Sequence, residues 1–307
     1  MIYQPIRLLV VLPEVPGDLV CCRYAVRLFA DQSIVTVLLR KSHAGLIADL
    51  PVAIVLVDGY SDLATISLNK IFPNNSYFNY IVDLHNDTCT FNFVFRFSSL
   101  TIGFSEPDVG IIYDQSFPWR TPPIEGVHSA VRHSRAVPGH LTAVNFDVAS
   151  WKRAFYVPRL PLQADRIAFC PGSSMAGKEK RVSPIAWKNT ADYIRGLGKH
   201  IVWFLGPDEQ ELYTVLVLPC DTVQSGSFDS VIIEHSSCKF GISHDTVHLH
   251  IRAHLPVETC ALFVRGEERE WGGYPSGVFI LRAPTSELPS TVSLAMIRWL
   301  DHATADC

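Results

Sequence analysis

The chain has 307 residues, of which 48% are hydrophobic and 18% charged. This length exceeds what one hydrophobic core usually serves, so it predicts two well-buried domains rather than a disordered chain. The formal net charge of −4 argues against a general nucleic-acid binder, which normally carries a basic excess. Eight cysteines without a C-x-x-C pair fit reduced thiols better than a disulfide framework.

The start of the chain carries a largely apolar run from Ile6 to Leu12. It is too short to span a bilayer. Glu14 and Asp18 follow without a small-residue cleavage site, which argues against a signal peptide. We therefore expect a cytoplasmic protein and leave peripheral contact with the inner membrane open.

Short apolar runs alternate with helical patterns in the first half. Such runs predict strands at Leu8–Leu12, Ile34–Leu39, Val52–Val57 and Tyr80–Leu84. We expect a helix from Asp18 to about Ala30, and then a proline-rich loop over Phe117–Pro123 and a short helix over His128–Val137. Strand, helix, strand in this rhythm predicts a parallel sheet with helices on both faces.

The pattern breaks down over Trp151–Leu162 and then restarts. The second half predicts strands at Arg166–Phe169, His200–Leu205, Ser230–Glu234, Lys239–Ile242 and Thr259–Phe263. It predicts helices at Trp187–Leu197, stopped by Gly198, and at Ser286–His302.

The predicted fold class is therefore α/β, with two Rossmann-like domains over residues 1–155 and 156–307. Ligands of such sheets bind at the carboxyl ends of the strands, so we expect the site in a cleft between the two domains. Whether the C-terminal helix packs back on the first domain is left open.

A short turn, Pro16-Gly17-Asp18, follows the first predicted strand. Gly17 permits a tight turn, and Asp18 then lies at a helix N-terminus. The simpler interpretation is a helix cap, because aspartate is a favoured N-cap residue. A catalytic base at the carboxyl end of a strand is compatible with that role.

A glycine turn with hydroxyls and lysines follows the strand that ends at Phe169. In the turn Pro171-Gly172-Ser173-Ser174, the backbone N–H groups of the residues after Pro171 suit a phosphate group, as does the cation of Lys178 or Lys180. Residues 172–178 also match the phosphate loop of ATP-binding proteins, but Glu179 stands where that motif needs Ser or Thr to hold Mg²⁺. An ordinary basic surface loop is the alternative.

Two further constellations lie after predicted strands. Gly206-Pro207-Asp208-Glu209 offers a carboxylate for a ribose hydroxyl, or is a solvated turn. Ser243-His244-Asp245-Thr246 precedes His250 and His254, whose spacing of one helical turn could hold a metal. Because no cysteine or acidic residue supplies an obvious third ligand, we expect no metal site.

Several common motifs are missing from the sequence. It contains no G-x-G-x-x-G after a strand, no D-x-D pair and no G-x-S-x-G elbow. A dinucleotide oxidoreductase, the glycosyltransferase class that holds its metal on D-x-D, and a serine hydrolase are therefore not supported.

Taken in order, these motifs resemble the heptosyltransferase family (glycosyltransferase family 9, GT-B fold) over most of the chain. In the first half, Pro16-Gly17-Asp18 is similar to the family's Gly-Asp turn, and the segments similar to its DL strand and IGF are Ile81–His85 and Ile102-Gly103-Phe104. In the second half the similar segments are Pro171–Ser174 with Lys180-Arg181 and Trp187, Gly206–Glu209, and Asp245-Thr246 with His250.

The sequence departs from the family pattern at a few positions. Val247 replaces a motif glycine, Val264 stands where a second glycine is common, and Pro184 lies one position late. The chain thus resembles a divergent member of the family.

The resemblance implies an inverting, metal-independent glycosyltransferase without a cofactor. It would move a heptose or related sugar from a nucleotide-diphosphate donor, such as ADP-heptose, to a bacterial surface glycan or lipopolysaccharide-core acceptor. Asp18 would be the catalytic base. The second domain would bind the donor through Ser173, Ser174, Lys180, Glu209, Asp245, Thr246 and His250. The first domain would bind the acceptor through Arg96, His128 and Arg132.

Three alternatives stay open. One is another GT-B enzyme, namely a nucleotide-sugar hydrolase or epimerase. The second is an ATP-using protein with a phosphate loop. The third is a non-catalytic protein that binds a sugar nucleotide, which Val247 would favour.

Overall fold

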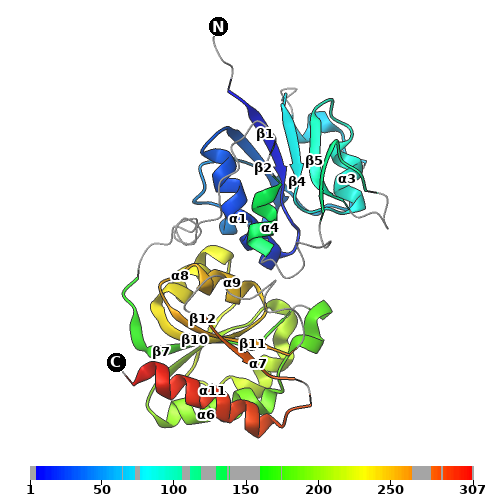
Figure 1. Ribbon diagram of the computed structural model, residues 1–307. Helices are drawn as coiled ribbons and strands as arrows, with labels where there is room; N and C mark the ends of the chain where they lie inside the picture. Colours follow the sequence, from blue (N-terminus) through cyan, green and yellow to red (C-terminus); the bar gives the residue numbers. More distant parts are fainter. Residues whose placement is uncertain are drawn as a thin grey trace. The chain divides into compact units, whose positions relative to one another are not determined.

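The structure is a computed structural model of the 307-residue chain. It describes residues 5–63, 65–72, 77–105, 111–118, 129–136, 138, 160–173, 175–264, 278–284 and 286–305. The chain divides into two compact units, Met1–Ala154 and Phe155–Cys307 (Figure 1). Each unit is described by itself.

The first unit is built on a parallel sheet. Its strands are β1 (Arg7–Val11), β2 (Ile34–Arg40), β3 (Ala53–Val57), β4 (Tyr80–Asp83), β5 (Leu100–Ser105) and β6 (Gln115–Pro118). The connecting helices are α1 (Pro16–Ala30), the 3₁₀ helix η1 (Lys41–Leu46), α2 (Leu68–Ile71), α3 (Thr88–Val94) and α4 (Ser129–Arg135). The strand order is β3-β2-β1-β4-β5-β6, which is the order of a Rossmann fold.

The second unit repeats this architecture. Its strands are β7 (Gln163–Cys170), β8 (His200–Phe204), β9 (Thr222–Gln224), β10 (Cys238–His244), β11 (Glu258–Phe263) and β12 (Val278–Arg282). Its helices are η3 (Met175–Lys180), α6 (Pro184–Gly196), η4 (Pro207–Glu209), α7 (Gln210–Leu216), α8 (Phe228–Ser237), α9 (Val247–Ala253) and α11 (Pro289–Thr304). The order β12-β11-β10-β7-β8-β9 is again that of a Rossmann fold.

Each sheet is buried by helices on its faces. In the second unit, Phe169 of β7 lies edge to face with Trp187 of α6 at 5.4 Å between ring centroids and with Trp203 of β8 at 5.1 Å. The C-terminal helix α11 packs on α6 and buries Met296 in the same core. Truncation of a core tryptophan such as Trp203 to alanine would cost about 3–5 kcal/mol.

The prediction of two Rossmann-like α/β domains is confirmed by these sheets, and most expected strands are present. The end of α6 follows the expected chemistry, because Gly198 adopts a positive φ of 72° just beyond the helix. The short helix expected over His128–Val137 is α4, which the structure describes from Ser129 to Arg135.

The strand expected at Ser230–Glu234 is wrong, because these residues form part of helix α8. β-Branched residues favoured a strand locally. Strands β9 and β10 are not neighbours but lie at separate places in a parallel sheet, and a crossover between parallel strands is usually a helix. Val231, Ile232 and His235 form the buried side of that helix.

The expected cap at Asp18 is also wrong. Val15 is the N-cap of α1, Pro16 lies at the first helical position, and Asp18 is in the first turn. Proline is favoured there because its fixed φ suits a helix start. Part of the expected loop Phe117–Pro123 is the edge strand β6, where a proline costs no ladder hydrogen bond; residues 119–123 lie outside the described part.

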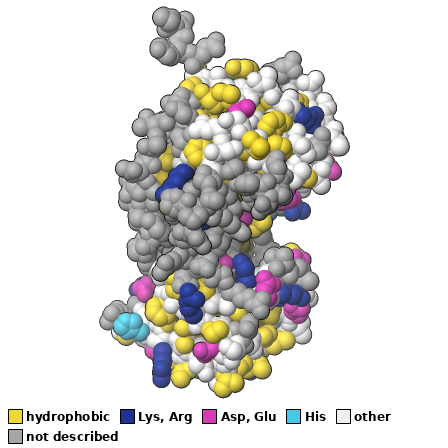
Figure 2. Space-filling model, turned by 45° about the vertical axis from the view of Figure 1, so that its right-hand side comes forward, with side chains coloured by type: hydrophobic (Ala, Val, Ile, Leu, Met, Phe, Trp, Pro, Cys, Tyr) yellow, Lys and Arg dark blue, Asp and Glu magenta, His cyan; other side chains and the backbone are white. Residues whose placement is uncertain are grey.

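The seven cysteines that the structure describes are free thiols. None of the helices in the described ranges is long and apolar enough to cross a membrane. On the face shown in Figure 2, basic and acidic side chains of the described residues are interspersed with hydrophobic ones.

Candidate active site

The second unit places its polar motifs at the point where its strand order reverses. Strands β7 and β10 are neighbours in the sheet, whereas their next strands, β8 and β11, lie on opposite sides. Ser173 follows β7, and Asp245 and Thr246 follow β10. In open α/β sheets this is where ligands bind.

Lys180 meets Asp245 across this point. The ammonium of Lys180, at the end of η3, donates to Oδ2 of Asp245 at 3.0 Å. The lysine side chain is 36% exposed and the aspartate 7%. On the other carboxylate oxygen, Nε2 of His250 lies 3.9 Å from Oδ1. Three of the predicted donor-binding residues therefore lie together.

The neighbouring groups are polar and partly unpaired. Burial, helped by the charge of Lys180, lowers the pKa of His250 to about 4, so its imidazole is neutral at neutral pH. Thr246 is the N-cap of α9, but its side chain does not cap the helix. Its buried Oγ1 has no hydrogen-bond partner within the ranges that the structure describes, which leaves a hydroxyl to meet a ligand.

Ser173 is held in a second cluster. Its hydroxyl donates to the carbonyl of Gly177 at 2.7 Å and accepts from Nε of Arg181 at 3.0 Å. The same guanidinium also donates to the Ser173 carbonyl and to Glu211 at 2.8 Å. Arg181 thus fixes the turn that follows β7.

Glu209 joins this cluster from the loop after β8. Its Oε2 accepts from the N–H of Gly206 at 2.7 Å, and its Oε1 lies 3.7 Å from Arg181. Burial raises the pKa of Glu209. The N–H of Gly206 and the charge of Arg181 lower this pKa, but burial is the larger effect. A Cβ at Gly172 would overlap this carboxylate, so only glycine lets the two loops approach this closely.

In the first unit, Asp18 lies just beyond the carboxyl end of β1, in the first turn of α1. It is half-buried. Strands β1 and β4 are neighbours at the switch point of this sheet, so the residues that follow β4 share the same edge as Asp18.

The residues after β4 form a polar network that the sequence analysis did not predict as functional. Asp83 is fully buried and accepts from the hydroxyl of Tyr113 at 2.8 Å and from the N–H of His85 at 3.0 Å. Burial raises the pKa of Asp83. Nε2 of His85 donates to Oδ2 of Asp87 at 3.1 Å, and Asp87 caps α3. Asn86 between them has a positive φ of 60°; such strain clusters at functional sites.

Comparison with known proteins rests on structure. No family model matches the sequence, and no curated protein matches it. A crystal structure of glycosyltransferase family 9 from Veillonella parvula matches with a TM-score of 0.71 at 16% identity, over 96% of this chain and 92% of the other.

Two Escherichia coli structures also match. Heptosyltransferase WaaC with ADP has a TM-score of 0.75 at 16% identity, over 97% of this chain and 99% of the other. ADP-heptose LPS heptosyltransferase II has a TM-score of 0.72 at 16% identity, with the same coverage. The chain has the GT-B heptosyltransferase fold.

Four predicted binding residues of this heptosyltransferase fold are not among the residues of the two clusters described above. Arg96 donates to the carbonyls of Leu63 at 2.9 Å and Ile66 at 2.6 Å. Arg132 is buried on α4, which packs against α1. Ser174 and His128 lie outside the described residues. The roles of these four side chains in binding stay predictions.

The phosphate-loop lysine has a different environment from Lys180. Lys178 lies 3.2 Å from Glu211, and both side chains are exposed. Such a pair contributes little to stability. Lys178 and Lys180 therefore point to different partners, with only Lys180 beside the residues that follow β10.

The structure also brings together a cysteine and two histidines that sequence spacing did not link. Cys170, His235 and His248 could hold a metal ion, since their ligand atoms lie within 4.8 Å of one another. They come from β7, α8 and α9. No local motif joins residues so far apart, and helical spacing in the sequence indicated only His250 and His254 as a ligand pair.

Proposed function

We propose that this protein is an inverting glycosyltransferase that needs no metal ion for the transfer step. Its donor would be a sugar linked to a nucleoside diphosphate, with ADP-heptose as the first candidate. Its acceptor would be a bacterial surface glycan or the lipopolysaccharide core. The proposal includes action in the cytoplasm, with peripheral contact at the inner membrane.

The observation that carries the proposal is the position of Lys180 beside Asp245 at the switch point of a Rossmann sheet. The ammonium is partly exposed, so a diphosphate can approach it without unfolding the loop. Fixed cations and backbone N–H groups stabilise a diphosphate leaving group as its charge develops. The solved structures with this fold include one with ADP and one of an ADP-heptose transferase, which supports the choice of donor.

The chemistry assigns one role to each cluster. Asp18 would accept the proton of an acceptor hydroxyl as that oxygen attacks the anomeric carbon of the donor. A carboxylate of ordinary basicity suffices, because the hydroxyl becomes acidic only as the bond forms. The nucleoside diphosphate would leave from the opposite face of the sugar, which inverts the anomeric centre. Lys180, Ser173 and the unpaired hydroxyl of Thr246 would meet the departing phosphates.

Glu209 would accept a hydrogen bond from a hydroxyl of the donor's ribose; its carboxylate packs against Gly172 and accepts from the N–H of Gly206. In the first unit, Arg96, His128 and Arg132 would bind the acceptor. His250 would act through its contact with Asp245, which keeps the loop after β10 in place.

Calorimetry with a panel of nucleoside diphosphates and nucleotide sugars tests the donor. Preferential binding of one diphosphate, weakened by Lys180→Ala, is the expected result. Product analysis with and without glycan acceptors then separates the enzyme classes. A transferase releases diphosphate only as the acceptor is glycosylated, a hydrolase releases free sugar without acceptor, and an epimerase returns an isomerised nucleotide sugar. Absence of any nucleotide binding would reject the proposal.

A further inference from the structure

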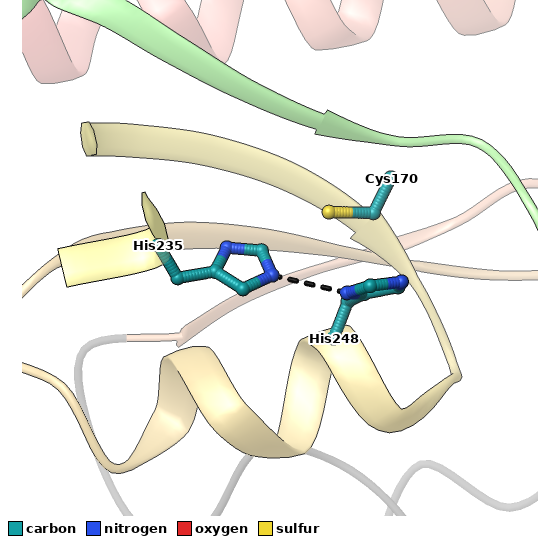
Figure 3. Close-up of side chains that lie close together, drawn as sticks. All are labelled: Cys170, His235 and His248. Atoms are coloured by element: carbon teal, nitrogen blue, oxygen red, sulfur yellow. Dashed lines mark hydrogen bonds between the residues drawn. The ribbon is translucent and has the colours of Figure 1, made fainter. Parts of the chain in front are cut away.

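Three side chains that are not among those assigned to the donor meet in the second unit. Cys170 is the last residue of β7, His235 lies in the last turn of α8, and His248 lies in the first turn of α9 (Figure 3). Nε2 of His235 lies 3.0 Å from Nδ1 of His248. In Figure 3 the sulfur of Cys170 lies above the dashed line that joins the two imidazole rings.

The spacing is close to that of a tetrahedral metal site. Bonds of about 2.3 Å to sulfur and about 2.1 Å to nitrogen place ligand atoms roughly 3.4–3.6 Å apart around Zn²⁺. The sulfur and the two nitrogens lie within 4.8 Å of one another. Shifts of about 1 Å in the side-chain atoms would reach that geometry.

The environment keeps the two imidazoles in the form that binds metals. Burial, with the charges of Arg252 and His248, lowers the pKa of His235. Burial and Arg252 lower the pKa of His248 to about 4. Both rings are thus neutral at neutral pH, and neutral imidazole is the ligand state. His235 is held in place by Phe204, whose ring stacks on it at 3.6 Å.

We propose that Cys170, His235 and His248 bind one borderline-soft transition-metal ion, with Zn²⁺ as the ion that fits the donor set best. A water molecule would complete the tetrahedron. The ion would be structural, because its ligands are not the residues assigned to the sugar nucleotide.

The binding step balances in protons. Burial raises the pKa of the Cys170 thiol to about 12, while the charge of Arg252 lowers it. Zn²⁺ binding therefore breaks the S–H bond, forms a Zn–S bond and releases one proton to solvent. The two imidazoles stay neutral, since the proton shared between them moves to a ring nitrogen outside the site. About one proton is thus released per ion bound.

Arg252 supplies the charge that favours the thiolate. Its buried guanidinium donates to Thr259 Oγ1 at 3.0 Å and to the Glu258 carbonyl at 2.9 Å, and it pairs with no carboxylate in the ranges described. A thiolate at Cys170 would place a negative charge near this cation. The thiolate also offsets the repulsion between the guanidinium and a bound dication.

The ion would connect the two segments that flank the candidate donor site. Cys170 lies two positions before Gly172 in the turn that contains Ser173. His248 lies two positions after Thr246 and three after Asp245. Because β7 and β10 are already paired in the sheet, a metal bridge would add a link from the end of β7 to helices α8 and α9. The inference does not depend on the proposed transferase activity, because metal content is measured without a substrate.

Elemental analysis of the full chain, purified without an affinity tag from zinc-supplemented medium, tests the site. The expected content is about one zinc ion per chain. Cys170→Ser and His248→Gln should each lower it at least about tenfold, since each removes a ligand. Cys260→Ser removes a buried thiol and His200→Gln an imidazole elsewhere in the same sheet, and these controls should retain the zinc.

A second measurement keeps the test decisive if the variants fold poorly. Wild-type protein stripped by a chelator and loaded with Co²⁺ should show a thiolate-to-cobalt charge-transfer band and tetrahedral d–d bands. Zinc content unaffected by Cys170→Ser, or Co²⁺ loading without the thiolate band, would overturn the proposal.

Discussion

Lys180 and Asp245 are 65 positions apart in the chain, yet the ammonium of one lies 3.0 Å from a carboxylate oxygen of the other. The contact joins the turn after β7 to the turn after β10, the two strands at which the sheet order reverses. A diphosphate arriving there would share the lysine with the aspartate. The lysine thus has a carboxylate partner in the structure, and a bound diphosphate would be a second one.

Substitution of Lys180 should weaken donor binding selectively. Lys180→Ala removes a charge-assisted contact of about 1.5–3 kcal/mol, so the Kd for the diphosphate should rise roughly 10- to 100-fold. Lys178→Ala removes only an exposed pair with Glu211 and should change the Kd by less than about twofold. Calorimetry with both variants measures this. The reverse ranking would favour a phosphate loop built on Lys178.

Replacement of the proposed base should separate binding from chemistry. Asp18→Asn should lower the transfer rate at least about 10²-fold, because amide nitrogen cannot accept the hydroxyl proton. Donor affinity should stay unchanged, since Asp18 lies in the first unit. Asp31→Asn at the other end of α1 is the matched control and should retain activity. Near-normal turnover in Asp18→Asn would remove this residue from the mechanism.

The transfer step should proceed without a soluble divalent cation. The proposed site offers cations and N–H groups to the diphosphate in place of Mg²⁺. Initial rates measured in excess EDTA, and again with added Mg²⁺ or Mn²⁺, should agree within about twofold. Brief exposure to EDTA removes any metal ion bound at the diphosphate. The buried site at Cys170 is tested separately, by measuring metal content. A rate that requires Mg²⁺ would contradict the metal-independent chemistry.

Gly172 should tolerate no side chain. Gly172→Ala places a Cβ in the space of the Glu209 carboxylate and should lower the free energy of unfolding by about 1–3 kcal/mol. Gly196→Ala, where a Cβ meets nothing within 4 Å, should instead raise it by about 0.5–1 kcal/mol. Thermal and urea unfolding compare the two. In a Glu209→Ala background the cost of Gly172→Ala should shrink, because the overlapping group is gone.

The sequence predicted the architecture well because its signals are local and repeated. Buried parallel strands such as β1 and β8 appear as largely apolar runs, and glycines such as Gly198 mark helix ends. It failed where tertiary context overrides local preference. The β-branched segment 231–233 is helical because it lies in the crossover between parallel strands. Helix α1 begins at Pro16 with Val15 as its N-cap, so Asp18 is in the first turn and not at the cap.

The candidate site was predictable only in part. Motifs after strands, such as Asp245-Thr246 and Ser173, fall at the carboxyl edge of the sheet because strand direction determines that edge. The network around Asp83 depends on Tyr113, which is 30 positions away. The cluster of Cys170 and His235 likewise joins residues that no spacing rule connects.

Acid should destabilise the second unit through His244. Burial lowers the pKa of this histidine to about 4, and its Nε2 accepts the N–H of Val182 at 2.9 Å. Above the unfolded pKa of about 6.5 both states are neutral and pH has no effect. Below about pH 6.5 His244 is protonated in the unfolded state and still neutral in the folded state. The free energy of unfolding therefore falls as the pH decreases to about 4. The loss at pH 5 is about 2 kcal/mol.

Unfolding of the second unit, followed by the fluorescence of Trp187, whose ring lies 5.3 Å from that of His244, measures this dependence. His244→Gln should reduce the slope between about pH 6.5 and pH 4, because it removes one titrating group while His235, His248 and His250, whose pKa values burial also lowers, remain. His200→Gln, in β8 of the same sheet, should leave the slope due to His244 unchanged. An equal slope in His244→Gln and in the wild type would show that other groups account for the acid sensitivity, and that folding does not lower the pKa of His244.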